Sequence, residues 1–129
     1  MVSDLPTAKK PVEFVGGARA ALRQLPQPVR YVFGYAILLA QKGGKHPDAK
    51  PLKGFGSAGV LEVVEAFAGN AYRAVYTVKF ENVVYVLDAF QKKAKQGAAT
   101  PKVDIDRIKA RLKMAEEHYQ ETYRVKKTG

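Results

Sequence analysis

The chain has 129 residues, a length that suits a single domain built around one hydrophobic core. Hydrophobic residues make up 47% of the chain and charged residues 26%, a globular composition that excludes a disordered protein. The formal net charge of +10 favours an acidic partner, such as nucleic acid, an anionic membrane surface or an acidic protein. The absence of cysteine excludes disulfides, thiolate catalysis and cysteine-based zinc sites.

The N-terminal residues 1–11 contain no apolar run long enough for a signal peptide. The longest apolar run, Tyr35 to Ala40, is far too short to span a bilayer. We therefore expect a cytoplasmic protein without a membrane partner. We expect one domain over residues 1–129, with a core from about 11 to 117 and a fraying polar tail over 118–129.

The N-terminal half predicts one short strand and two helices. The strand covers Pro11 to Val15, and a short helix follows over Ala18 to Leu25. A longer helix begins near Pro28 and stops at Gly43-Gly44. Its apolar residues recur at helical spacing: Val29, Val32, Phe33, Ala36, Ile37 and Ala40. Residues 43–59 are rich in glycine and are predicted to form a loop.

The C-terminal half predicts three strands and a last helix. The strands are Val60 to Phe67, Tyr72 to Phe80 and Val83 to Phe90. The helix begins near Thr100-Pro101, with Thr100 as the N-cap. The order β-α-α-β-β-β-α indicates an α+β fold in which helices pack on one face of a small antiparallel sheet.

The predicted strand pairing separates an uncharged sheet face from a charged one. With two-residue turns at Gly69-Asn70 and Glu81-Asn82, Arg73 lies opposite Phe90. The uncharged face, which should be buried, collects Tyr72, Ala74, Tyr76, Val78, Phe80, Val83, Tyr85, Leu87 and Ala89. The other face collects Arg73, Lys92, Glu62, Asp88, Phe90, Val75, Val84 and Val86, among others. We take this second face, beside the basic segment from Gln91 to Lys113, as a candidate RNA-binding surface.

Three stretches together resemble one family of bacterial proteins. They are Asp48-Ala49-Lys50-Pro51-Leu52-Lys53-Gly54-Phe55-Gly56, Tyr72-Arg73-Ala74-Val75-Tyr76-Thr77-Val78, and Val84-Tyr85-Val86-Leu87-Asp88-Ala89-Phe90-Gln91-Lys92-Lys93. In this order and spacing, and with Ala99-Thr100-Pro101 before the last helix, they resemble the RelE/ParE toxin superfamily. The resemblance is closer to its phage-related, HigB-like branch and covers nearly the whole chain.

The resemblance implies the toxin of a type II toxin–antitoxin system. Many members are mRNA interferases that cleave mRNA in the ribosomal A site, whereas ParE-like members inhibit DNA gyrase without nuclease chemistry. It also implies a cognate helix-turn-helix antitoxin, with which the toxin forms a complex on operator DNA. A ribosome-dependent mRNA endonuclease is the first hypothesis. A gyrase inhibitor, or an inactive phage-derived relative that only binds an antitoxin, is the alternative.

RNA cleavage by attack of the 2′-OH needs a base, an acid and cations that stabilise the developing charge. By the resemblance, Arg73 matches the family arginine that binds the phosphate. Lys92 and Lys93 match the basic cluster after the last strand and would stabilise charge or supply a proton. The family lysines on the preceding strand are absent here. Lys53 is a candidate replacement and Glu62 a candidate base, but the departure from the family pattern leaves the acid and the base unassigned. Phe90 and Lys95 complete the expected RNA-binding surface.

Each candidate also has a purely structural interpretation. Arg73 could pair with Asp88 or Glu62, and the lysines could belong to a solvated strand end or loop. His46 and His118 are predicted to be solvated. We find no metal-ligand spacing, and Gly54-Phe55-Gly56 alone does not predict a phosphate-binding loop, so no cofactor is expected.

Overall fold

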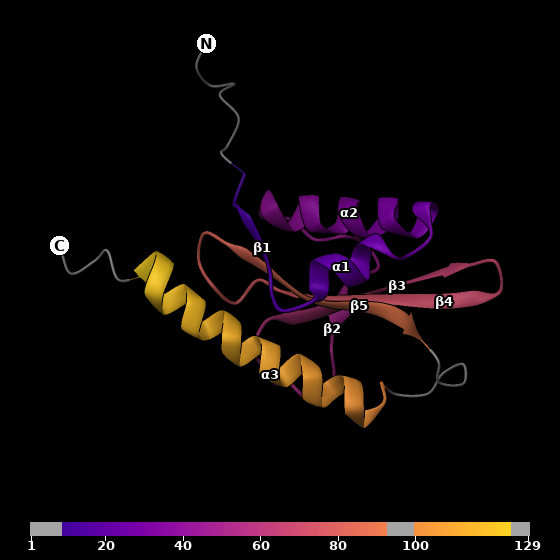
Figure 1. The fold of residues 1–129 in the computed structure, drawn as a ribbon. Coiled ribbons are helices and arrows are strands. Elements are labelled where there is room, and N and C mark those ends of the chain that lie inside the picture. The colour runs from indigo at the N-terminus through magenta and orange to yellow at the C-terminus, as the bar shows by residue number, and fades with distance from the viewer. Residues whose placement is uncertain (1–8, 93–99, 125–129) are drawn as a thin grey trace, which may run out of the picture.

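Helices cover both faces of a five-stranded sheet in the computed structural model, which describes residues 9–92 and 100–124 (Figure 1). The elements are β1 (Val12–Phe14), α1 (Ala18–Arg23), α2 (Gln27–Gln41), β2 (Lys50–Pro51), β3 (Val60–Phe67), β4 (Asn70–Thr77), β5 (Val84–Lys92), α3 (Lys102–Tyr119) and the π-helical turn η2 (Gln120–Arg124). The predicted α+β class is therefore confirmed. In the described part of the chain, no helix is both long and apolar enough to cross a membrane.

The sheet has the order β1-β5-β4-β3-β2, and its central meander is antiparallel as predicted. β1 lies parallel to β5 at one edge. The strand β2 lies where the sequence predicts a loop. It pairs only Lys50 with Glu62 and Pro51 with Leu61, so it is too short to leave an alternating pattern in the sequence.

The prediction that all helices pack on one face is wrong. On one face α1 and α2 pack against β-strand residues such as Val63, Tyr76 and Val86. On the other face, Ile108 and Ala115 of α3 belong to the same cluster as Val75 and Leu87. Both faces of the central strands carry buried apolar residues, so both require cover from water. Figure 1 shows α1 and α2 on one side of the sheet and α3 on the other.

The hairpin between β3 and β4 turns at Ala68-Gly69 and not at the predicted Gly69-Asn70, since Phe67 pairs with Asn70. Ala68 and Gly69 both have positive φ, at 53° and 81°, which suits a tight hairpin turn. The observed pairing differs from the predicted one by two residues. A shift of two leaves every side chain on its predicted face, so Glu62 still lies on the face of Arg73.

The pairing of β4 with β5 is correct only in part. Arg73 pairs with Phe90 as predicted, but a bulge interrupts the register between Val75 and Tyr76. Beyond the bulge, Tyr85 and Leu87 face α3, and Val84 and Val86 lie in the cluster beneath α2. Their predicted faces were therefore reversed, because one extra residue in a strand exchanges inward and outward positions.

Helix α3 is fastened to the sheet through Asp88 of β5, whose exposure is 3%. Asp88 Oδ2 lies 2.8 Å from Arg107 Nε, and its Oδ1 lies 3.1 Å from Arg111 Nη1. The same Oδ1 accepts the backbone N–H of Ala89 at 2.9 Å, and Arg111 Nη1 also donates to the Leu87 carbonyl at 2.9 Å. Two turns of α3 thus depend on one buried carboxylate.

Removing this carboxylate should loosen α3. We predict that Asp88→Ala lowers the free energy of unfolding by about 3 kcal/mol, because Arg111 loses its counter-ion and Arg107 keeps only Asp104. The exposed pair of Lys102 with Asp106 provides the matched control. Asp106→Ala should lower the free energy of unfolding by less than about 0.5 kcal/mol. Urea titration measures both values. Equal losses in the two variants would contradict this role of Asp88.

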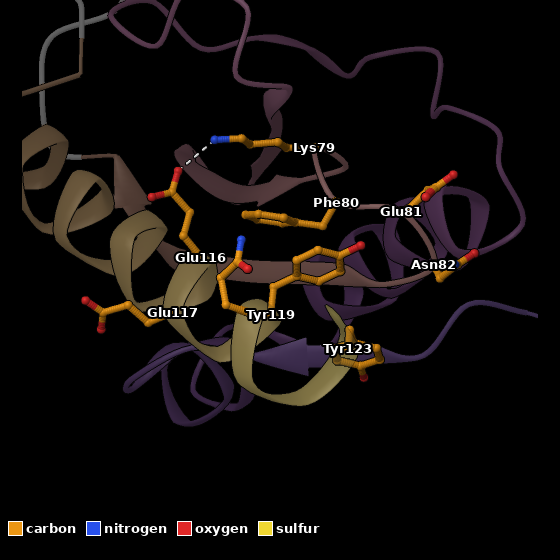
Figure 2. A pocket seen from close by; sticks show the side chains of 9 residues that line it. Lys79, Phe80, Glu81, Asn82, Glu116, Glu117, Tyr119 and Tyr123 are labelled. Carbon is orange, nitrogen blue, oxygen red and sulfur yellow. Dashed lines mark hydrogen bonds and ion pairs between the residues drawn. The ribbon is translucent and has the colours of Figure 1, made fainter. Parts of the chain in front are cut away.

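The end of α3 and η2 pack against the rest of the molecule, although we expected a fraying tail over residues 118–129, of which 125–129 lie outside the described residues. The Tyr119 ring lies between Phe80 and Tyr123, with centroid distances of 4.8 and 5.8 Å (Figure 2). Tyr123 donates its hydroxyl to Glu13 Oε2 at 2.8 Å, which connects η2 to β1. His118 is exposed, as predicted, and its Nδ1 contacts the Tyr85 hydroxyl at 2.8 Å. The core therefore extends to Tyr123.

This packing makes stability depend on pH. Burial, and then the hydrogen bond and charge of Glu13, raise the pKa of Tyr123 to about 12. The unfolded value is about 10, so above that pH the unfolded chain loses its proton first and stability falls as the pH rises towards 12. We predict lower urea midpoints at pH about 11 than at pH about 9, with a smaller fall in Tyr123→Phe. An identical fall in both proteins would contradict this assignment.

Candidate functional site

A pocket of about 560 Å³ opens where strands β2 to β5 meet the start of α3. Its lining residues are Lys50, Pro51, Leu52, Lys53, Gly54, Glu62, Arg73, Lys92, Thr100 and Ile105. We call it the Arg73 pocket. Four of these residues are cations and one is an anion, so the lining carries 4 − 1 = +3. Such an excess at a concave surface favours an anionic ligand.

The floor of the Arg73 pocket is a buried ion pair. Arg73 and Glu62 are 5% and 7% exposed, and Arg73 Nη1 lies 2.9 Å from Glu62 Oε1. The two groups are close enough to form an ion pair, but Glu62 Oε1 accepts no hydrogen bond from Arg73. Among the described residues, Arg73 Nε also has no hydrogen-bond partner. This nitrogen is itself buried, so it could donate to a ligand only after the Arg73 side chain moves.

The hydroxyl of Thr100 accepts a hydrogen bond from Arg73 Nη1. This contact replaces the predicted cap, because α3 begins at Lys102 with Pro101 at the N-cap position and no side-chain cap bond. A threonine before a proline and a helical pattern resembles a cap in sequence. Sequence reasoning therefore missed its place at the pocket.

The rim of the pocket carries lysines from two sides. Lys50 of β2 and Lys53 just beyond it are exposed, and Lys92 at the end of β5 is half-buried. Lys50 was not among the predicted site residues, because its position depends on the short pairing of β2 with β3. Glu62 is the one described carboxylate in the lining, and it already pairs with Arg73. The rim lysines can therefore bind an anion.

Phe90 lies beside the pocket on the same sheet face, directly across from Arg73. The Arg107 guanidinium lies over its ring, 5.7 Å from the centroid. Burial lowers the pKa of Arg107, but its hydrogen bonds to Asp104 and Asp88 outweigh this effect and raise it. A fixed cation and an aromatic ring together offer a surface on which a nucleobase can stack.

The structure brings most of the predicted site residues together. Arg73, Glu62, Lys92 and Lys53 line one pocket, and Phe90 adjoins it. Of the two predicted partners of Arg73, Glu62 is the one it contacts, because Asp88 is engaged by α3. The predicted residues Lys93 and Lys95 lie outside the described residues.

The arrangement suits phosphate binding. A phosphate in the pocket would meet Arg73 from below and lysines from its rim, so charge developing on its oxygens would be stabilised from two sides. Neither His46 nor His118 lines the pocket. Proton transfer there would therefore depend on the lysines and Glu62.

Residues 20–113 match the model of a protein family described as phage-derived protein Gp49-like. The chain belongs to this family. The match confirms the phage-related relationship expected from the sequence. No curated protein matches the chain significantly.

The solved structures that are similar to this chain include two from bacterial toxin systems. Escherichia coli toxin RelE, as a double arginine-to-alanine mutant in the free state, is 22% identical, with 69% of this chain and 90% of that chain covered and a TM-score of 0.49. The toxin–antitoxin complex RelBE2 of Mycobacterium tuberculosis includes a chain that is 21% identical, with 65% and 99% covered and a TM-score of 0.46.

Replacing only one member of the buried Arg73–Glu62 pair should lower the stability of the fold. We predict that Arg73→Ala lowers the free energy of unfolding by about 3 kcal/mol, because Glu62 is left buried without a counter-ion. In the double variant Arg73→Met with Glu62→Leu, most of this loss should be recovered, since two apolar side chains replace both charges. Urea denaturation measures both values. A double variant less stable than Arg73→Ala would contradict this account.

Proposed function

We propose that this protein is the toxin of a type II toxin–antitoxin system and a ribosome-dependent mRNA endonuclease. The observation that carries the proposal is the Arg73 pocket, where a partly satisfied guanidinium lies beneath a lysine rim and beside Phe90. Membership of a phage-derived family agrees with it. RelE is a toxin and RelBE2 a toxin–antitoxin complex, the class of protein that we propose for this chain.

In the proposed reaction, the 2′-OH of one nucleotide attacks the adjacent phosphorus and the bond to the 5′-oxygen of the next nucleotide breaks. The products are a 2′,3′-cyclic phosphate and a free 5′-OH. Arg73 binds the phosphate oxygens and Lys92 donates a proton to the leaving oxygen. Glu62 accepts the proton of the 2′-OH once Arg73 has turned from its carboxylate to the phosphate. Phe90 stacks on a neighbouring base, and Lys53 binds the backbone.

The proposal includes four partners: the ribosome, its mRNA, an antitoxin and operator DNA. The ribosome presents the mRNA in its A site, and a helix-turn-helix antitoxin neutralises the toxin and forms with it a complex on operator DNA. All of these are cytoplasmic. The positive charge of the chain suits each nucleic-acid contact.

A second function, gyrase inhibition without catalysis, is favoured by two specific observations. Arg73 is paired with Glu62, which offsets its charge. The strand β3, Val60–Phe67, carries no lysine that could assist catalysis. The same features suit an inactive relative that only binds an antitoxin.

Induction in cells separates these functions. We predict that the wild-type chain arrests growth and generates new 5′ ends within translated mRNA. The variant Arg73→Met with Glu62→Leu should fold but produce neither effect. Arg23→Met, which changes an exposed arginine on α1, is the matched control and should remain toxic. An SOS response with intact mRNA would contradict the nuclease and support the gyrase inhibitor.

A further inference from the structure

Helix α2 exposes an uncharged face on the side of the sheet opposite the Arg73 pocket. No charged residue occurs from Tyr31 to Gln41, yet Tyr31 and Tyr35 are 67% and 54% exposed. Gly34 and Leu38 share their helical stripe, and we call these four residues the α2 outer face. α2 is the outermost element on its side of the sheet (Figure 1).

The inner face of α2 already supplies the core. Its buried residues are Val29, Phe33, Ala36, Ile37 and Ala40. A helix that has one apolar face against the core normally carries charged or polar residues on the other. Here the second face is aromatic and aliphatic in its middle, which is typical of a surface that a protein partner covers.

Gly34 gives a second, independent indication of a partner. It lies inside the helix, where glycine is among the least favourable residues. A Cβ atom at this position would meet nothing within 4 Å in the described part of the chain, so the fold itself does not require glycine. The missing side chain leaves a gap beside Tyr31 and Tyr35 into which the backbone of a partner could fit.

The charges around the α2 outer face indicate the chemistry of that partner. No acidic residue occurs between Val15 and Pro47. The cations of this segment are exposed, and none lies within ion-pair distance of a described carboxylate: Arg19, Arg23, Arg30, Lys42 and Lys45. An acidic partner is complementary to this rim, whereas a second copy of the chain would place cations against cations.

We infer that the α2 outer face docks an acidic, amphipathic segment of a partner protein. Its apolar residues cover Tyr31 and Tyr35, its backbone approaches Gly34, and its carboxylates meet Arg30 and Lys42. RNA fits this surface less well, because phosphates would find no cation along the centre of the helix. The identification of this partner as the antitoxin rests on the proposed function.

The docked segment does not fill the Arg73 pocket, since α2 and the pocket lie on opposite faces of the sheet. An antitoxin bound at the α2 outer face would thus leave the cationic pocket open. The antitoxin would then neutralise the toxin by its size, because the complex would be too large to enter a confined site such as the ribosomal A site.

The test uses the full chain and the protein encoded by the adjacent reading frame, with the dissociation constant measured by calorimetry. Tyr31→Glu with Tyr35→Glu should weaken binding about 100-fold, because two aromatic anchors are lost and acidic groups are repelled. Gly34→Gln should weaken it about 10-fold by filling the gap. The matched control is Val103→Glu with Met114→Glu, two exposed apolar residues on α3, which should stay within about threefold of wild type.

Each of the following outcomes would overturn the inference that the α2 outer face docks an acidic partner segment. Unchanged affinity in the tyrosine variant, or no binding by the wild-type chain, excludes this docking site. Loss of a wild-type dimer in that variant, seen by sedimentation, would assign the face to a second copy. Loss of binding to an RNA hairpin, with antitoxin affinity intact, would assign it to RNA.

Growth assays keep the two proposals apart. If the inference holds, the tyrosine variant stays toxic but is no longer neutralised by co-expression of the adjacent protein. A toxic variant that is still neutralised refutes the docking site alone. A wild-type chain that binds as predicted but never arrests growth refutes the toxin function alone.

Discussion

The position of α3 on the sheet depends on the buried carboxylate of Asp88. Arg107 and Arg111 reach it from successive turns of the helix, so both the rotation and the translation of α3 are restricted. The same restriction brings Thr100 to Arg73 and places Arg107 over Phe90. The site is therefore assembled by a structural ion pair that takes no part in the proposed chemistry.

The cationic side chains behind the net charge of +10 fall into groups with different positions in the fold. Arg107 and Arg111 hold the fold through Asp88. Lys50, Lys53 and Lys92 surround a pocket whose only described carboxylate is already paired. The cations beside α2 form a second basic region across the sheet. These two regions would allow the proposed substrate and the proposed protein partner to bind on different faces.

Much of the fold and part of the site followed from local patterns. The apolar residues of α2 recur at helical spacing. The predicted turn at Glu81-Asn82 correctly placed Arg73 opposite Phe90, and the predicted β3–β4 turn, although two residues out in register, kept Glu62 on the face of Arg73. The bulge after Val75 was not predictable, because both faces of β5 are apolar and either register would bury them. Thr100 and Lys50 were missed because tertiary contacts alone bring them to the pocket.

The central claim is that the Arg73 pocket promotes attack of a 2′-OH on mRNA held by the ribosome. The most direct measurement is single-turnover cleavage of mRNA on reconstituted ribosomes, with and without a 2′-deoxy substitution at the cleaved position. The account predicts that the wild-type chain cleaves the unmodified mRNA to a 2′,3′-cyclic phosphate and leaves the deoxy substrate intact. Equal cleavage of the two substrates, or cleavage of neither, would contradict it.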